Sequence, residues 1–199
     1  MTHPKLLLFD IGGVLVENVG FDRLNDLLPT RMSNAAIKSK WLSCPVVRDF
    51  ELGLTSPETF AQRLLEKWNI SLGVGAFLAA FTSWPKGFYP GAVELLQRLR
   101  QHYTVACLSN SNALHWERFD GFRQHFHVSL SSHLLGVIKP DEECFDRALR
   151  ECDAAPREAI FFDDSLDNVH SARKLGIQAF HVCGLGEVHR ALSESSLLQ

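Results

Sequence analysis

Four short polar motifs bring together residue types that can hold a metal ion and an anion. Each motif follows a predicted strand, and the four are Asp10, Ser109-Asn110, Lys139-Pro140 and Asp163-Asp164. A carboxylate that follows an apolar run such as Leu6–Phe9 is costly to bury unless something uses its charge. Because the carboxyl ends of parallel strands meet at one edge of a sheet, we expect the four motifs to converge there.

The carboxylates in this set predict a metal site. Asp10, Asp163 and Asp164 would repel one another unless a cation lay between them, and their hard oxygen atoms favour Mg²⁺. Lys139 could hold a nucleophilic carboxylate and neutralise a transferring phosphoryl group, while Ser109 and nearby backbone N–H groups could hold phosphate oxygens. Each motif alone has an ordinary structural explanation, such as a helix cap. The order of the motifs, each at a strand end, predicts a catalytic site.

The elements that must position these motifs alternate between strand and helix. The predicted strands are short and mostly apolar, and they cover residues 6–9, 103–108, 127–130, 159–162 and 177–182. Helices are predicted between them, at residues 91–101, 141–151, 167–175 and 187 to about 192. Short apolar strands are typical of parallel sheets that are buried on both faces. The sequence therefore predicts an α/β fold with a doubly wound parallel sheet.

Residues 17–90 interrupt this alternation with helical periodicity and no convincing strand. Phe21, Leu24 and Leu27 form one apolar stripe, and the pair Ser56-Pro57 is typical of a helix start. We therefore expect an all-helical insertion after the first strand. In this division residues 1–16 and 91–199 form the α/β core, and residues 17–90 form a small cap. A cap that leaves the sheet at this point would stand over the strand ends and could exclude water from them.

The order of the four motifs resembles that of the haloacid dehalogenase (HAD) superfamily, and the helical insertion resembles its C1 cap. The segments FDIGGVLVE, CLSNSNALHW, FFDDSLDNVHSARKLGI and FELGLTSPETFAQRL are most similar to the branch that contains alpha-D-glucose-1-phosphate phosphatase. The resemblance implies a Rossmann-like core and a Mg²⁺-dependent phosphatase acting on a small phosphorylated metabolite. A sugar phosphate, such as an anomeric hexose phosphate, is the substrate class that it favours.

The same resemblance implies a role for each motif residue. Asp10 would be the nucleophile that becomes an aspartyl-phosphate. Ser109 and Lys139 would bind the transferring phosphoryl group, and Asn110 would line the substrate pocket. The implied ligands of Mg²⁺ are Asp10, the backbone carbonyl of Gly12 and Asp164, with Asp163 close by.

Gly12 departs from the pattern of many superfamily phosphatases, which have an aspartate at this position. That aspartate protonates the leaving oxygen and then accepts a proton from the attacking water, and such catalysis is typically worth about 10²- to 10⁴-fold. Its absence leaves three hypotheses. The substrate has a good leaving group, as in anomeric, acyl or aryl phosphates; a cap carboxylate such as Glu17 or Asp22 takes over; or the protein is weakly active.

Two alternative functions are compatible with the same fold. A 2-haloacid dehalogenase also uses an aspartate nucleophile and lacks the second aspartate, but it needs no metal. It therefore has little reason to keep the adjacent carboxylates Asp163 and Asp164, which together with Lys139 favour phosphoryl transfer. A non-catalytic HAD-like binding protein is supported only by Gly12.

Composition narrows the range of partners. The formal net charge of −3 provides no basic surface for nucleic acid or acidic membranes, and no apolar run has membrane-spanning length. The five cysteines are scattered without a CxxC pair, which is typical of reduced thiols in a cytoplasmic protein. The expected partner is a small phosphorylated molecule, and the expected state is a monomer.

Overall fold

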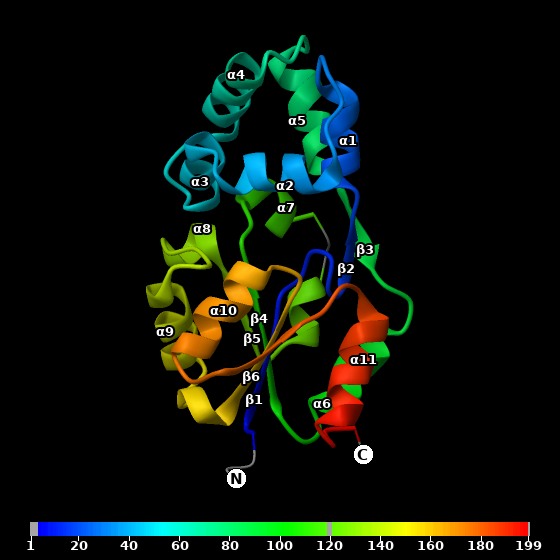
Figure 1. The fold of residues 1–199 in the computed structure, drawn as a ribbon, viewed down its shortest axis with the longest axis vertical. Coiled ribbons are helices and arrows are strands. Elements are labelled where there is room, and N and C mark those ends of the chain that lie inside the picture. Colours follow the sequence, from blue (N-terminus) through cyan, green and yellow to red (C-terminus); the bar gives the residue numbers. More distant parts are fainter. Residues whose placement is uncertain (1–3, 119–120, 199) are drawn as a thin grey trace.

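A five-stranded parallel sheet forms the centre of the lower part of the molecule (Figure 1). The computed structural model describes residues 4–118 and 121–198; residues 1–3, 119–120 and 199, which the sequence assigns to the core, lie outside the described part. The strand order is β5-β4-β1-β6-β7, with β1 at Leu6–Phe9, β4 at Thr104–Ser109, β5 at Val128–Ser131, β6 at Ala159–Asp163 and β7 at Gln178–His181. All neighbouring strands pair in parallel, which confirms the predicted α/β fold.

The central strand β1 is apolar because both of its faces are covered. Its four residues have no exposed surface, and Leu6 pairs with Thr104 on one side and Ala159 on the other. The ladder continues for one more residue, where the backbone N–H of Asp10 donates to the carbonyl of Phe162 (2.8 Å). Asp10 therefore emerges at the carboxyl edge of the sheet, between the ends of β4 and β6.

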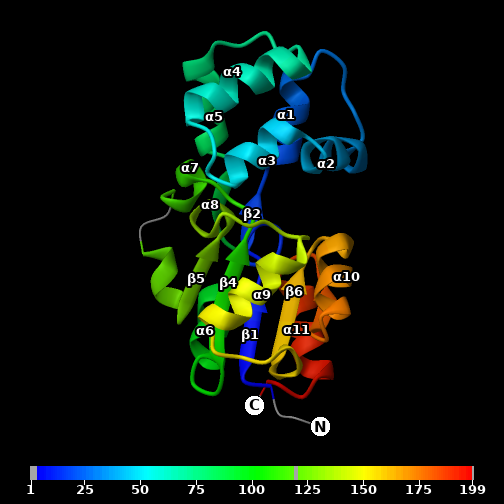
Figure 2. The same ribbon diagram turned by 90° about the vertical axis from the view of Figure 1, so that its left-hand side faces the viewer.

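Helices cover the two faces of the sheet (Figure 2). One face packs against α6 (Ala92–Leu99) and α11 (Leu185–Glu194), and the other against α9 (Glu142–Glu151) and α10 (Leu166–Lys174). Residues of β1 alternate between these two cores, as the period of a strand requires. Shorter helical segments are α7 (Ala113–Trp116), α8 (Ser132–Leu135), η1 (Phe122–His125) and η2 (Pro156–Glu158). No helix in the described ranges is long and apolar enough to cross a membrane.

Five helices between residues 18 and 85 lie together at the top of Figure 1, where the sequence predicts the cap. They are α1 (Gly20–Leu27), α2 (Asn34–Leu42), α3 (Pro45–Glu51), α4 (Pro57–Trp68) and α5 (Val74–Thr82). Their aromatic side chains make a separate small core, in which the rings of Phe50 and Phe60 stack with centroids 4.1 Å apart. Helix α4 begins as the sequence predicts, since the Ser56 hydroxyl accepts a hydrogen bond from the backbone N–H of Thr59 (3.2 Å).

A two-stranded antiparallel ribbon connects the cap to the core, and the prediction of no strand in residues 17–90 is therefore wrong. The ribbon consists of β2 (Val16–Asn18) and β3 (Pro85–Phe88), with Val16 opposite Phe88. Both segments are short and mostly polar or half-buried, so they lack the alternating pattern that identifies a strand. The two segments are far apart in the sequence, and they pair because each connects the cap to the core. The ribbon lies at the border between the proposed core and cap, a division that stays a prediction.

Candidate active site

Lys139 is the centre of a buried ionic cluster at the carboxyl edge of the sheet. Its ammonium group donates to Asp10 Oδ1 (2.8 Å), Asp163 Oδ2 (2.7 Å) and the backbone carbonyl of Leu108 (2.7 Å). The Lys139 side chain is 1% exposed, so all three donors are satisfied by the protein. Burial alone would lower the pKa of Lys139, but the charges of Asp10 and Asp163 outweigh it and hold that pKa above its ordinary value.

Asp10 carries a charge that its surroundings oppose. Burial raises the pKa of this carboxyl above its ordinary value of 3.8; Lys139 lowers it, and the neighbouring carboxylates Asp163 and Asp164 raise it further. The single ammonium group of Lys139 is therefore shared between the carboxylates of Asp10 and Asp163. A divalent cation next to Asp10 would favour the ionised form, which is the form that can act as a nucleophile.

The two adjacent aspartates at the end of β6 have different surroundings. Asp163 is fully buried, and besides Lys139 it accepts hydrogen bonds at Oδ1 from the Ser165 backbone N–H (2.8 Å) and Asn168 Nδ2 (2.9 Å). The Asp164 side chain is 29% exposed, and its Oδ2 is held by Lys38 Nζ (2.8 Å) from the cap helix α2. Asp163 is thus committed to protein donors, whereas Asp164 is the more accessible carboxylate.

The carboxylate set fits a hard divalent cation. Asp10, Asp163 and Asp164 each offer an oxygen atom, and these three atoms lie within 4.8 Å of one another. Oxygen donors at this spacing suit Mg²⁺, which keeps several water molecules and needs few protein ligands. The adjoining loop bends tightly at Gly13, whose φ is +78°, and a Cβ there would lie 3.1 Å from Asp164 Oδ2. Glycine is therefore required at position 13 both by the turn and by the nearby carboxylate.

The polar pair that follows β4 divides into two roles. Ser109 ends the strand, is nearly buried and lines the cavity above Asp10. Asn110 also lines this cavity, but its amide is engaged with the Lys139 backbone: Nδ2 donates to the carbonyl (2.8 Å), and Oδ1 accepts from the N–H (3.0 Å). The Asn110 side chain therefore positions the segment that carries Lys139. Direct substrate binding by Asn110 stays a prediction.

A cavity of about 180 Å³ lies between the core and the cap. Its core side includes Asp10, Gly12, Ser109, Asn110, Lys139 and Asp164, which are the predicted site residues apart from the fully buried Asp163. Its cap side combines the charged groups of Lys38 and Glu51 with aromatic rings. The aromatic residues that line the cavity are Phe21, Trp41, Phe81 and Trp84 from the cap, and His115, Trp116 and Phe122 from the core. The site is therefore ionic at its floor and largely aromatic at its walls.

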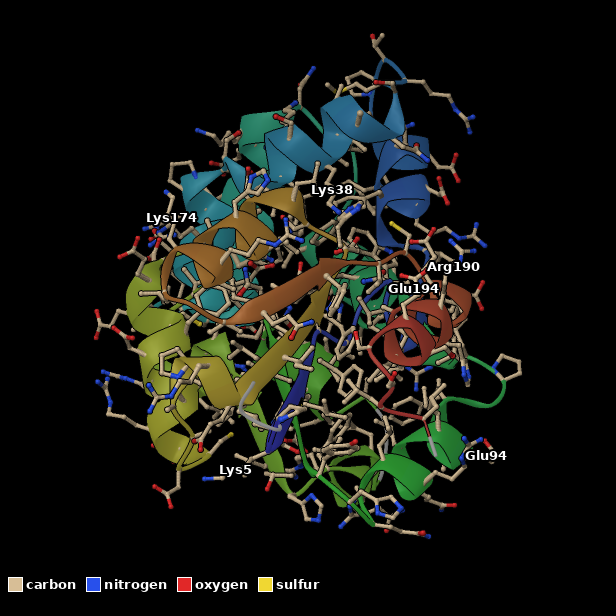
Figure 3. The ribbon with its side chains drawn as sticks, turned by 60° about the horizontal axis from the view of Figure 1, so that its bottom comes forward. Lys5, Lys38, Glu94, Lys174, Arg190 and Glu194 are labelled. Carbon is tan, nitrogen blue, oxygen red and sulfur yellow. The ribbon has the colours of Figure 1, made fainter. Side chains whose placement is uncertain are left out.

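Sequence reasoning missed two charged residues of the cap. Lys38 and Glu51 line the cavity, whereas Glu17 and Asp22, which the sequence offered as replacement acids, are exposed and are not among its lining residues. Figure 3 labels Lys38 where the cap meets the core. A charged residue between Phe50 and Leu52 was a usable signal for Glu51, since such a position in a helix is often buried. The sequence alone does not tell which cap carboxylate faces inward.

Comparison with known proteins agrees with this geometry. A D-ribitol-5-phosphate phosphatase of Bacteroides thetaiotaomicron is 24% identical over 186 residues, which cover 88% of this chain and 90% of the relative. A sesquiterpene phosphatase of Aspergillus oryzae is 28% identical over 194 residues, covering 91% of each chain.

A solved structure extends the likeness to three dimensions. The crystal structure of a HAD family enzyme from Bacteroides thetaiotaomicron, in complex with magnesium and inorganic phosphate, has a TM-score of 0.69 at 26% identity, and the match covers 89% of this chain and 93% of that one. The family model of haloacid dehalogenase-like hydrolases matches residues 4–176, a range that contains all four motifs. The chain therefore belongs to the haloacid dehalogenase-like hydrolases.

Proposed function

We propose that this protein is a Mg²⁺-dependent phosphatase that acts on a small phosphorylated metabolite through an aspartyl-phosphate on Asp10. The observation that carries the proposal is the buried cluster in which Lys139 holds Asp10 at the floor of a cavity, with two more carboxylates beside it. The phosphatases and the magnesium complex among its relatives support the same activity. Membership of the glucose-1-phosphate phosphatase branch stays a prediction.

In this mechanism Asp10 attacks the phosphorus atom while the bond to the leaving oxygen breaks. Lys139 keeps the attacking carboxylate oriented and offers positive charge to the phosphoryl oxygens, and Ser109 binds one of them. Asp10, Asp164 and the Gly12 carbonyl would hold Mg²⁺, with Asp163 behind them. When bound, the metal neutralises charge on the phosphoryl group. Water then hydrolyses the aspartyl-phosphate and restores Asp10.

The favoured substrate is a sugar phosphate, with an anomeric hexose phosphate as the leading candidate. An anomeric leaving group needs less protonation than a simple alkoxide, which suits the glycine at position 12. The polar groups of Lys38 and Glu51 could bind sugar hydroxyls, and the rings of Trp41 or Trp84 could pack on a sugar face. The D-ribitol-5-phosphate phosphatase among the relatives supports a sugar or polyol phosphate.

The aromatic walls favour a second candidate, a phosphate monoester with an apolar leaving group. Seven aromatic or imidazole rings line the cavity, and apolar surface of this kind gains free energy by covering an apolar ligand. The relative named as a sesquiterpene phosphatase acts on a substrate of that class. A panel of hexose 1-phosphates, polyol phosphates, aryl phosphates and prenyl monophosphates, compared by kcat/KM, would rank the two candidates.

Metal removal provides the first test of the reaction class. We expect EDTA to abolish hydrolysis of p-nitrophenyl phosphate and excess Mg²⁺ to restore it, because Asp10, Asp163 and Asp164 bring oxygen atoms together that would hold the metal, and the metal would neutralise charge on the phosphoryl group. Release of phosphate is the measurement, with a Ca²⁺ addition as the control for general ionic effects. Turnover of a 2-haloacid that is insensitive to EDTA would instead establish the dehalogenase alternative. Absence of turnover for any phosphate, with ligand binding retained, would favour the non-catalytic one.

The two adjacent aspartates are expected to differ in their effect on metal affinity. Asp164→Asn should raise the Mg²⁺ concentration for half-maximal activity by roughly tenfold or more, because a neutral amide oxygen replaces the accessible, negatively charged carboxylate. Asp163→Asn should act mainly on stability, since it weakens a fully buried contact with Lys139. Mg²⁺ titrations and urea unfolding separate the two effects, and Asp146→Asn, at an exposed position of α9, is the matched control. A larger rise in the Mg²⁺ requirement for Asp163→Asn would reverse this order.

A further inference from the structure

Glu51 is a buried carboxyl group of the cap that faces the reaction centre. It is the last residue of α3, is 8% exposed, and lines the same cavity as Asp10 and Lys139. Carboxyl groups are seldom buried unless they are paired or used, and no ion pair to Glu51 occurs among the described residues. Its burial therefore calls for an explanation that packing does not supply.

Hydrogen bonds to both its side chain and its backbone fix the position of Glu51. Trp41 Nε1 donates to Oε1 (3.3 Å), and among the described residues no hydrogen-bonding group reaches Oε2. The Glu51 backbone carbonyl accepts from the Ser132 hydroxyl (2.5 Å), which in turn accepts from the backbone N–H of Ser111 (3.0 Å), two residues after Ser109. One carboxyl oxygen is thus left for a ligand, on a backbone tied to the phosphate-binding segment of the core.

The end of α3 also lies unusually close to the core. Gly53 has a φ of +75°, and a Cβ at this position would lie 2.7 Å from the carbonyl oxygen of His133. Only glycine fits such an approach. The contact holds the cap segment that carries Glu51 directly on the core next to α8, so the carboxyl group does not depend on a mobile loop for its placement.

The surroundings of Glu51 favour a carboxyl group that still carries its proton near neutral pH. Burial raises its pKa, to about 7; the Trp41 hydrogen bond and the charge of Lys139 lower it, and the charge of Asp10 raises it. The other titratable groups that line the cavity are Lys38 and Asp164, which pair with each other across the cap and core, and His115.

We propose that Glu51 is the catalytic acid of this enzyme, donating a proton from the cap to the leaving oxygen that position 12 cannot serve. The inference rests on the proposed phosphatase function. As Asp10 forms its bond to phosphorus, the bond to the leaving oxygen breaks, and that oxygen keeps the electron pair and takes the proton of Glu51. The alcohol leaves, and Glu51 remains as a carboxylate. In the second step this carboxylate takes a proton from the water that attacks phosphorus, which releases inorganic phosphate and restores both side chains.

Other groups near the site do not serve this purpose. Asn18 lies nearest to position 12, with Nδ2 3.4 Å from where a Gly12 Cβ would be, but an amide has no proton to transfer at neutral pH. Burial lowers the pKa of His115, to about 4, and its Nε2 is bound to the carbonyl of Phe81 (2.8 Å). His115 is therefore neutral and engaged at the pH where the cap acid is needed.

The test compares two leaving groups in Glu51→Gln, with p-nitrophenyl phosphate and ribitol 5-phosphate as probes. The aryl leaving group departs without a proton, whereas the alkoxide needs one. We expect kcat/KM for the alkyl phosphate to fall by about 10²- to 10⁴-fold and that for the aryl phosphate to fall far less. Glu58→Gln, at an exposed position of α4, is the matched control and should change neither. In the wild type, kcat/KM for the alkyl phosphate should fall as the pH rises through about 7, and Glu51→Gln should lose this limb.

Other outcomes would contradict either the role of Glu51 or the phosphatase function itself. Equal losses on both substrates would assign Glu51 a purely structural role and overturn the inference, and so would a wild type that hydrolyses aryl phosphates but no alkyl phosphate. A wild type that hydrolyses neither would overturn the phosphatase proposal itself. If Glu51→Gln does not fold, Glu51→Asp keeps the acid but withdraws it by one methylene, and its loss should again be confined to the alkyl phosphate.

Discussion

Asp10→Asn is expected to abolish turnover, with a loss of roughly 10⁵- to 10⁶-fold in kcat, the scale at which removal of a nucleophile acts in another well-studied hydrolase. An amide has the shape of the carboxylate but cannot form a stable acyl-phosphate. The fold should persist, because Lys139 keeps its contacts with Asp163 (2.7 Å) and the Leu108 carbonyl (2.7 Å). Phosphate release and urea unfolding measure the two quantities separately.

A covalent intermediate gives the same prediction a second measurement. Wild-type protein quenched in acid during turnover should carry a phosphoryl group that mass spectrometry places on Asp10, and Asp10→Asn should carry none. Asp22→Asn, at an exposed position of α1 that does not line the cavity, should retain full activity. Near-full activity of Asp10→Asn would place the nucleophile elsewhere.

Lys139→Met is expected to cause the largest loss of stability, about 3–5 kcal/mol in the free energy of unfolding, together with a loss of activity. Methionine fills much of the same volume, but it leaves Asp10 and Asp163 buried side by side without their shared cation. Lys174→Met, at the exposed end of α10 that Figure 3 labels, removes an equal charge and should change stability by less than about 0.5 kcal/mol.

The deficit of Lys139→Met should shrink as the pH falls. Burial already raises the pKa of Asp10, and the substitution removes the group that lowers it. Native Asp10 then binds a proton more readily than Asp10 in the unfolded chain, so the stability of the variant rises relative to wild type between about pH 8 and about pH 5. Urea unfolding of both proteins at several pH values measures this difference. A deficit that is constant with pH would show that lost packing, rather than unpaired charge, causes the destabilisation.

The strands of the core could be predicted from the sequence because a strand that is buried on both faces of a sheet is a short run of apolar residues. The strand at Leu6–Phe9 has no exposed residue, and its prediction is confirmed to the residue. Helix α10 was predicted to within a residue at each end, since Gly176 lies just beyond its C-cap residue Leu175. The ribbon of β2 and β3 was missed because neither segment has a pattern of its own. Helices α2 and α3 lie inside the predicted all-helical insertion, but their individual bounds were not predicted.

The core residues of the site could be predicted from sequence motifs, whereas the cap residues of the site depend on tertiary packing. The core residues were found because three of the four motifs lie at the end of a strand, and parallel strands place their ends together; Lys139 is separated from the end of β5 by helix α8. The partners from the cap were not found, since the inward direction of Lys38 or Glu51 depends on how α2 and α3 pack. One of the three hypotheses for position 12 was that a cap carboxylate replaces the missing aspartate, but the residues that it named as examples, Glu17 and Asp22, are exposed. The distances between cap and core side chains depend on how the two parts pack together, so the sequence of neither part predicts them.

The central place of β1 in the sheet also governs how the chain can fold. Leu6 pairs with Thr104 and Ala159, so the partners of this strand lie roughly 100 and 150 residues further along. During synthesis the strand that carries Asp10 therefore has an apolar, unpaired edge until both β4 and β6 have been made. The helices of the cap, by contrast, can pack early through their local aromatic contacts. Long-range pairing of this kind makes folding slow and leaves hydrophobic strand edges open to aggregation in the meantime. The strand that carries the proposed nucleophile thus completes its pairing only with distant segments, so activity should return late in refolding, well after helical signal.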